Sequence, residues 1–396
     1  MALNHSPSIV TNGLAFAYDM ANIQKSWKGK PTTNLITSPN PTTVGGAWGV
    51  TGLSAVTANA AIAPDGTLTA TKLVASTSNT TFQFIAPASS SQPTGTITYS
   101  CHMKAGEYTT GSLFLTQSGN NGAVFNLTNG TVVSVTGTGN TAAITPHPNG
   151  NGWWRCSVTN TGGTVSAGYR VGPLNGCLAN VGGDGVSGIY VWNCQAEQQS
   201  FATPFVSGTR SSTQAIVDLT NTNTVTANLT YASDNTFSFD GTRSISFTNP
   251  LSAQTNLGQE WTVIAWVNID TSINQRLITG LNSSLYLTTG SNSSLLYLNG
   301  GVNDYYTYGG AIGGVGWCQV VFRFRNSDGA RTIYKNGVNI STGGPNLTSI
   351  PSGNLGTLTL GTSVNGLISN TMIYNRYITD AEVLQNFNAL RGRYGL

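Results

Sequence analysis

Short runs in which apolar and polar residues alternate dominate the chain, and they predict β-strands. Residues 8–20 read SIVTNGLAFAYDM, where Leu14, Phe16 and Tyr18 alternate with small or polar residues. The runs at 236–247 and 317–326 alternate in the same way. Successive side chains of a strand point to opposite faces, so this period is typical of half-buried strands. Residues 260–270, EWTVIAWVNID, are apolar in both phases, which predicts a central strand of a β-sandwich.

Two Asn-Gly pairs lie between alternating runs and predict hairpins. They are Asn129-Gly130 and Asn336-Gly337. Asn-Gly readily adopts a positive φ at both central positions of a tight turn, which matches the twist of the flanking strands.

A single segment near the end of the sequence has a helical pattern. Thr379 and Glu382 form a capping box. An apolar stripe follows at Val383, Leu384, Phe387 and Leu390, and Gly392 can end the helix. We expect this helix to lie across one edge or end of a sandwich.

Composition narrows the fold class further. Of 396 residues only 8% are charged, 48 are Gly, and the net charge is +3. This composition excludes coiled coils, collagen and disordered chains, and the net charge is too small to indicate a nucleic-acid-binding surface. Lys25, Lys28 and Lys30 form the one basic cluster, which is typical of a solvated loop. The prediction is an all-β protein of two antiparallel β-sandwiches of the jelly-roll type with one C-terminal helix.

Cysteine usage and the first residues bear on the cell compartment. The five Cys include no C-x-x-C pair, and Cys101 and Cys156 lie in strand-like runs, which predicts reduced, buried thiols. The opening MALNHSPSIVTNG lacks the features of a secretion signal, and no window approaches 18 apolar residues. We expect synthesis in a cytoplasm and no membrane partner.

Several motifs resemble known families. The C-terminal third resembles the concanavalin A-like, laminin-G-type sandwich of bacterial and phage surface proteins, and the opening residues resemble the start of that module in marine and cyanobacterial phages. The matching stretches are FSFDG (237–241), WTVIAWV (261–267), YKNGV (334–338), LGTSVNGLISNTMIYNR (360–376) and the closing helix. The middle resembles a carbohydrate-binding-module-type β-sandwich of phage particle proteins. Its matching stretches are DGTLTATKLV (65–74), YSCHMKAGEYT (99–109), GNGWWRCSVT (150–159) and IYVWNCQAEQQSFATPFV (189–206).

These resemblances imply that one domain interrupts another. Residues 1–30 and 207–396 then form the laminin-G-type sandwich, and residues 31–206 form the inserted, carbohydrate-binding-module-like sandwich. Surface loops tolerate such insertions. The hypothesis requires strand 8–20 to pair with strands beyond residue 207.

The acidic residues argue against catalysis. Glycosidases on this fold carry carboxylates at i, i+2 or i+4 of one strand. The only i, i+2 pair here is Asp380 and Glu382, at the start of the predicted helix, where both favour the cap and the dipole. His102, in a strand, reads as structural. We therefore expect no enzyme and no cofactor.

A structural Ca²⁺ is common in laminin-G-type folds. Asp240-Gly241 is a candidate for it, with a simple turn as the alternative.

Glycan binding needs exposed aromatic platforms beside polar groups. Trp153 and Trp154 place one indole on each face of a strand, so one belongs to a core and the other can be exposed at an edge. Tyr305, Tyr306 and Tyr308 lie between Gly-rich segments and predict a recognition loop. The alternative is that these aromatic residues pack locally or at a subunit contact.

The resemblances and the missing catalytic pattern imply a non-catalytic structural protein of a tailed-phage particle surface. It would be a tail, neck or head fibre or a capsid decoration protein, and a homo-oligomer, with a trimer as the simplest expectation. Its partners would be other virion proteins and host-surface or environmental glycans. The alternatives are a bacterial carbohydrate-binding lectin and a glycoside hydrolase.

Overall fold

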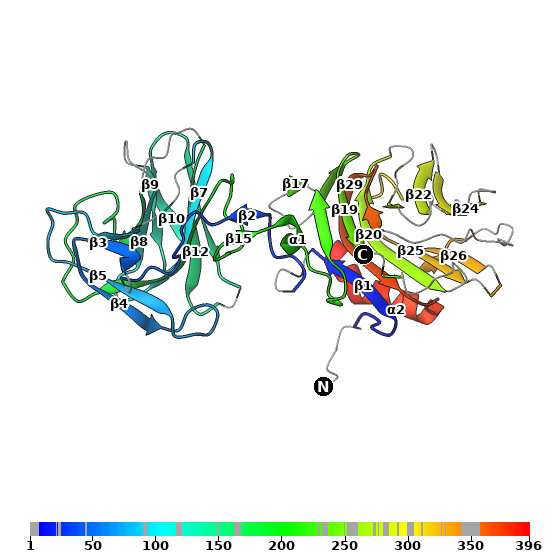
Figure 1. Ribbon diagram of the computed structural model, residues 1–396, viewed down its shortest axis with the longest axis horizontal. Coiled ribbons are helices and arrows are strands. Elements are labelled where there is room, and N and C mark those ends of the chain that lie inside the picture. Colours follow the sequence, from blue (N-terminus) through cyan, green and yellow to red (C-terminus); the bar gives the residue numbers. More distant parts are fainter. Residues whose placement is uncertain are drawn as a thin grey trace. The chain divides into compact units, whose positions relative to one another are not determined.

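Strand β1 (Leu14–Asp19) pairs antiparallel with β29 (Asn365–Tyr374), at the far end of the sequence. Contacts divide the chain into unit 1, residues 1–30 with 211–396, and unit 2, residues 31–210 (Figure 1). The computed structural model describes residues 8–396 except 21, 23–24, 44–45, 89, 91–92, 116–120, 149, 162–167, 229, 232–236, 249, 252–259, 272–274, 276, 280–284, 291–292, 299–304, 310–311, 326, 329 and 342–356.

Unit 1 is a sandwich built around an eight-stranded antiparallel sheet. In spatial order its strands are β17 (Thr230–Tyr231), β18 (Phe237–Asp240), β29, β20 (Trp261–Ile269), β25 (Cys318–Arg325), β26 (Ala330–Lys335) and β27 (Val338–Asn339), with β1 also on β29. The facing sheet contains β16 (Val225–Asn228), β19 (Ser244–Thr248), β28 (Thr357–Leu360) and β21 (Ile278–Thr279). A further sheet contains β22 (Leu285–Gly290), β23 (Ser293–Leu298) and β24 (Tyr305–Gly309).

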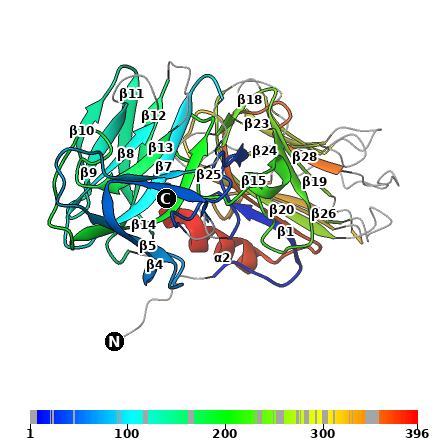
Figure 2. The ribbon, with the colours of Figure 1, turned by 60° about the vertical axis from the view of Figure 1, so that its left-hand side comes forward.

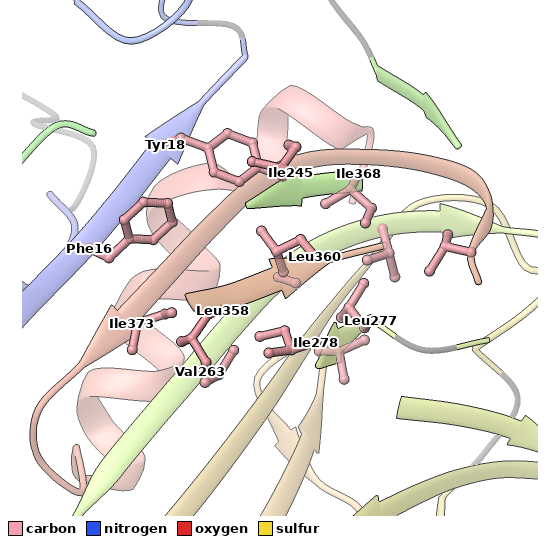
Figure 3. Close-up of a cluster of buried hydrophobic side chains, with 14 of the residues drawn as sticks. Phe16, Tyr18, Ile245, Val263, Leu277, Ile278, Leu358, Leu360, Ile368 and Ile373 are labelled. Atoms are coloured by element: carbon pink, nitrogen blue, oxygen red, sulfur yellow. The ribbon is translucent and has the colours of Figure 1, made fainter. Parts of the chain in front are cut away.

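The core of unit 1 lies between the two larger sheets. Phe16 and Tyr18 of β1 point toward Ile245 and Leu360 of the facing sheet (Figure 3). The ring of Phe16 stacks on that of Phe247 at 3.9 Å between centroids. The alternation therefore has the predicted consequence for Phe16 and Tyr18, which are buried in a core made mostly from residues beyond 211.

Helix α2 (Asp380–Leu390) covers the other face of the large sheet. The predicted capping box is present, since Thr379 Oγ1 accepts from Glu382 N at 3.3 Å and Glu382 Oε2 accepts from Thr379 N at 2.7 Å. Two details were predicted wrongly. Leu384 is 48% exposed. Gly392 does not end the helix, because a 3-10 turn, η2 (Arg391–Tyr394), continues to Gly395, which has φ of 73°. A short helix, α1 (Ser212–Ala215), also occurs.

Unit 2 is a sandwich of two six-stranded antiparallel sheets. One contains β10 (Thr131–Thr136), β9 (Gly122–Asn126), β8 (Thr110–Leu115), β13 (Tyr169–Pro173), β6 (Phe84–Pro87) and β3 (Trp48–Thr51). The other contains β11 (Asn140–Pro146), β12 (Trp153–Asn160), β7 (Ile97–Ala105), β14 (Gly188–Glu197), β5 (Ala70–Ala75) and β4 (Leu53–Ala61), and is seen in Figure 2. The all-β prediction of antiparallel sandwiches with a C-terminal helix is confirmed.

The chain enters and leaves unit 2 through paired backbone segments. Strand β2 (Thr32–Thr33) pairs with β15 (Thr209–Arg210). The buried carboxamide of Asn34 donates to Cys194 O and Val206 O, both at 3.1 Å. These contacts hold the two ends of the segment together, as a domain inserted through a surface loop requires.

The two Asn-Gly turns differ. At Asn336-Gly337, between β26 and β27, both residues have positive φ, 50° and 77°, as predicted. At Asn129-Gly130 only Gly130 has a positive φ, because the connection is longer, running from Asn126 to Thr131. There Asn126 Oδ1 accepts from the amides of Thr128 and Asn129 and holds the loop in another form.

The cysteines are buried. All five are free thiols, and burial raises the pKa of Cys156 above its ordinary value and that of Cys177 to about 12.

Candidate functional site

The β11–β4 sheet of unit 2 has one apolar face and one mixed face. On β7, Tyr99, Cys101 and Met103 point into the core, so the residues between them point outward. We call this outward side of β12, β7, β14 and β5 the outer face. It carries aromatic and basic side chains in place of the core residues of the inner side.

One row of this outer face crosses four strands. Trp153 on β12 pairs with Lys104 on β7, Lys104 pairs with Tyr190 on β14, and Tyr190 pairs with Lys72 on β5. Directly paired residues place their side chains on the same face, about 5 Å apart. The ammonium of Lys72 lies 6.0 Å from the centroid of the Tyr190 ring. The row therefore presents a partly exposed aromatic ring flanked by cations.

Two indoles of the outer face are covered. Trp153 is 2% exposed and donates to Ile62 O at 3.2 Å, while Trp192 is 9% exposed and donates to Thr69 Oγ1 at 3.1 Å. Ala63 and Ala70 form one buried cluster with the two rings. The 61–70 segment thus hides them, and Trp153 has no free ring face for a sugar.

Trp154 has the opposite orientation. It packs at the margin of the core, is partly exposed, and donates to Leu127 O at 2.8 Å. Its ring lies over Gly130, where an added Cβ would come within 2.2 Å of the indole. Each indole thus occupies a different face, as expected, and a recognition role for Trp154 stays a prediction.

The tyrosine cluster is placed only by its backbone. Tyr305, Tyr306 and Tyr308 were predicted to form a loop, but they lie on strand β24, which pairs with β23. Their side chains, and Asp304, lie outside the described residues. The Tyr cluster belongs to unit 1 and the Trp pair to unit 2.

At the β5 end of the row, the positive charge of Lys72 is paired with a carboxylate. Lys72 donates to Glu107 Oε1 at 2.8 Å, which raises the pKa of Lys72 and helps to lower that of Glu107 to about 2. Both groups reach solvent, so the pair contributes little to stability. The side-chain ammonium of Lys104 has no ion pair or hydrogen bond within the described part of the chain.

The carboxylates serve structure. Every acidic residue in the described ranges accepts a hydrogen bond from the chain. Glu197, fully buried, accepts from Gln195 and from Thr203. Asp380 and Glu382 lie in the first turn of α2 and bond Tyr334 and Arg376.

The Ca²⁺ candidate is also a turn residue. Asp240 accepts from Thr242 and Arg243, and these bonds help to lower its pKa to about 2. Among the described residues, no group of three His, Cys, Asp or Glu side chains is arranged to hold a metal ion.

Sequence reasoning missed Lys104, Tyr190 and Lys72. Each alternates with core residues in its own run, in YSCHMKA, GIYVWNC and ATKLVA, which places it on an outer face. Bringing the three together requires the strand order β7–β14–β5, which no local pattern specifies.

Comparison with known proteins identifies part of unit 1. Residues 239–384 match the sequence profile of the concanavalin A-like lectin/glucanases superfamily. Together with the sandwich of unit 1, this match shows a concanavalin A-like fold. A search of the curated proteins found no match. No helix in the described ranges is long and apolar enough to cross a membrane.

Several solved structures are similar at a distant level. The botulinum neurotoxin serotype D/C VPI 5993 binding domain is 17% identical, with a TM-score of 0.37, covering 46% of this chain and 51% of that one. A botulinum neurotoxin type C structure is 16% identical, with a TM-score of 0.36, and the match covers 45% of this chain and 49% of that one. The binding domain of Paraclostridial Mosquitocidal Protein 1 is 13% identical, with a TM-score of 0.37, and the match covers 44% of this chain and 49% of that one. The chain spans about half the length of these structures, and similarity at this level does not identify a function.

Proposed function

We propose that this protein is a non-catalytic surface component of a tailed-phage particle that contacts glycans through unit 2. It would be a fibre or a capsid decoration protein, exposed on the virion, assembled in the host cytoplasm and bound to other virion proteins as a homo-oligomer. The sequence resemblances to phage particle proteins and the low charge support the particle setting. The concanavalin A-like domain supports a role in recognition.

The observation that carries the recognition role is the row of Lys104, Tyr190 and Lys72 on the outer face, next to the covered Trp153. Sugars bind where the C–H face of a ring meets an aromatic side chain and hydroxyls meet polar groups. Tyr190 supplies a partly exposed ring. Lys104, Lys72 and Glu107 supply donors and acceptors beside it.

A non-catalytic role is consistent with the carboxylates. Glycoside hydrolysis requires two carboxyl groups at about 5–10 Å on either side of the scissile bond, one of them able to donate a proton. The pKa of Glu107, the acid beside Tyr190, is lowered to about 2, so it stays ionised at neutral pH. It is suited to accept hydrogen bonds and unsuited to act as a general acid.

A glycan array tests the recognition role. The purified full chain, labelled on one added cysteine, should bind a defined subset of glycans. Tyr190→Ala should lose that binding while its melting temperature stays within about 2 °C of the parent. An empty array, or unchanged binding by the folded Tyr190→Ala variant, would remove the recognition role and leave the structural one.

A further inference from the structure

The outer face of β12 and β7 concentrates groups that are cationic or can become so. Arg155 on β12 pairs with His102 on β7, one register step of two residues from the Trp153–Lys104 pair. His102 and Lys104 therefore lie on the same side of β7, about 7 Å apart along the strand. The ring of His147 meets that of His102 edge to face, at 5.3 Å between centroids.

Two buried polar atoms of this cluster have no partner. His102 is 3% exposed, and its Nδ1 has no hydrogen bond. The Nε of Arg155 also has none, although Arg155 Nη2 donates to Ser100 Oγ at 2.9 Å. Buried polar atoms are satisfied in the great majority of native structures, so a neighbouring pair of unsatisfied atoms needs an explanation.

The cationic groups of this cluster have no carboxylate in ion-pair contact among the described residues. Neither Arg155 nor Lys104 forms an ion pair in the part of the chain that the structure describes. Burying a guanidinium without a paired carboxylate is costly, and burial lowers the pKa of Arg155, while the charge of Glu197 acts in the opposite direction.

Charged and titratable groups face His102 from the neighbouring strands and from its own strand. β12 presents Arg155, the segment before β12 presents His147, and β7 itself adds Lys104. On β14, Trp192 pairs with His102, and the acid of that strand, Glu197, pairs with Thr98, four residues from His102 along β7. The Glu197 oxygens are already bonded to Gln195 and Thr203. Burial, then Arg155 and His147, lower the pKa of His102 well below its ordinary value.

We infer that this face binds an acidic sugar, with its carboxylate or sulfate held by Arg155 and Lys104 and its ring against Tyr190. The inference rests on the proposed role of unit 2 in glycan contact and names the class of glycan. Arginine and lysine donors recognise oxyanions strongly because both partners are charged. The anion supplies an ion-pair partner for Lys104 and for the Arg155 guanidinium. Arg155, Lys104 and Tyr190 are all partly exposed, so a ligand can reach them.

Matched probes isolate the acidic group. Isothermal titration of the full chain compares trigalacturonate with its methyl ester, which has the same rings without charge, and a heparin tetrasaccharide with its desulfated form. The variants are Lys104→Gln and Arg155→Gln. Arg243→Gln is the control, because it removes one positive charge from an exposed ion pair of unit 1.

The acidic form of at least one pair should bind about tenfold more tightly than its neutral form at low salt. Lys104→Gln should weaken that binding about fivefold or more, and Arg243→Gln should leave it unchanged. Arg155→Gln should also weaken it. If Arg155→Gln unfolds, the result for Lys104→Gln alone tests whether this face binds the acidic group. Preference for carboxylate over sulfate, or the reverse, identifies the source of the anion.

Equal binding of acidic and neutral forms would overturn the acidic class and leave glycan contact standing. Binding to none of the four probes would overturn the inference, and an empty glycan array would in addition overturn the proposed recognition role. Unchanged binding by folded Lys104→Gln would overturn the assignment of the site.

Discussion

Asp218 joins the two sequence-distant parts of unit 1, and removing its carboxylate should destabilise that unit. The side chain is fully buried. Its Oδ1 accepts from Ala17 N at 2.9 Å and Thr220 N at 3.1 Å. Its Oδ2 accepts from Thr220 Oγ1 at 2.6 Å and from Asn223 N and Nδ2 at 3.1 and 2.8 Å. One carboxylate thus connects β1 to the 218–223 loop, two segments of unit 1 that residues 31–210 separate in the sequence.

The cost of Asp218→Ala follows from these bonds. The amide of Ala17 lies on a strand residue that is 1% exposed, and an unsatisfied buried donor costs about 1–3 kcal/mol. The loop donors lose bonds to a charged acceptor, each worth about 1.5–3 kcal/mol, but water can replace some of them. We expect a loss of about 3–5 kcal/mol, which for a unit of this size lowers Tm by roughly 10 °C.

Calorimetry and hydrogen exchange of the full chain measure this effect. The unit 1 transition should fall, and the amides of residues 14–19 should exchange faster, while unit 2 keeps its protection. Asp240→Ala is the matched control in unit 1, because its exposed carboxylate bonds only a turn and Arg243, so we expect less than about 1 kcal/mol. A loss below 1 kcal/mol for Asp218→Ala, or unchanged exchange of residues 14–19, would show that the Asp218 carboxylate does not hold β1 in place.

Three further predictions concern other parts of the chain. Burial lowers the folded-state pKa of His102 and His147, so the unfolded chain takes up protons at a higher pH than the folded chain does. The free energy of unfolding, measured in urea, should therefore be constant just above pH 6.5 and fall below it, by up to about 1.4 kcal/mol per pH unit for each histidine. A flat pH profile would contradict this. Gly337→Ala should lower the free energy of unfolding by about 1–2 kcal/mol, because φ is 77° and the new Cβ would lie 3.1 Å from Leu384 of α2. Gly392→Ala is the control, because its Cβ would meet nothing within 4 Å and should leave stability unchanged. Equal effects of the two substitutions in thermal unfolding would speak against a strained turn. Residues 31–210, expressed alone, should unfold cooperatively, and a molten product would count against the inserted domain.

The sequence was informative wherever one local pattern decides the structure. The alternation around Phe16 and Tyr18 predicted a core strand, and the box of Thr379 and Glu382 predicted a helix start, because each depends on neighbours within a few residues. The Asn336-Gly337 turn was also predictable, since the strands meet directly at that pair.

Other features depend on distant segments and could not be predicted. Trp153 is hidden by the 61–70 segment, and the grouping of Lys104 with Tyr190 depends on β7 pairing with β14. The Tyr305–Tyr308 segment, predicted as a loop from its Gly-rich flanks, pairs with β23. That unit 2 is an independently folding insert, and that the chain belongs to a phage particle, stay predictions.

We propose that the chain lies on a particle surface and contacts glycans through the outer face of unit 2. An imaging reconstruction of particles purified from the source culture tests both parts of this proposal. We predict density for the chain outside the particle shell or tail, repeated by the particle symmetry, with Tyr190 and Lys104 facing solvent. Absence of the chain from the particles, or an outer face packed against neighbouring subunits, would contradict the claim.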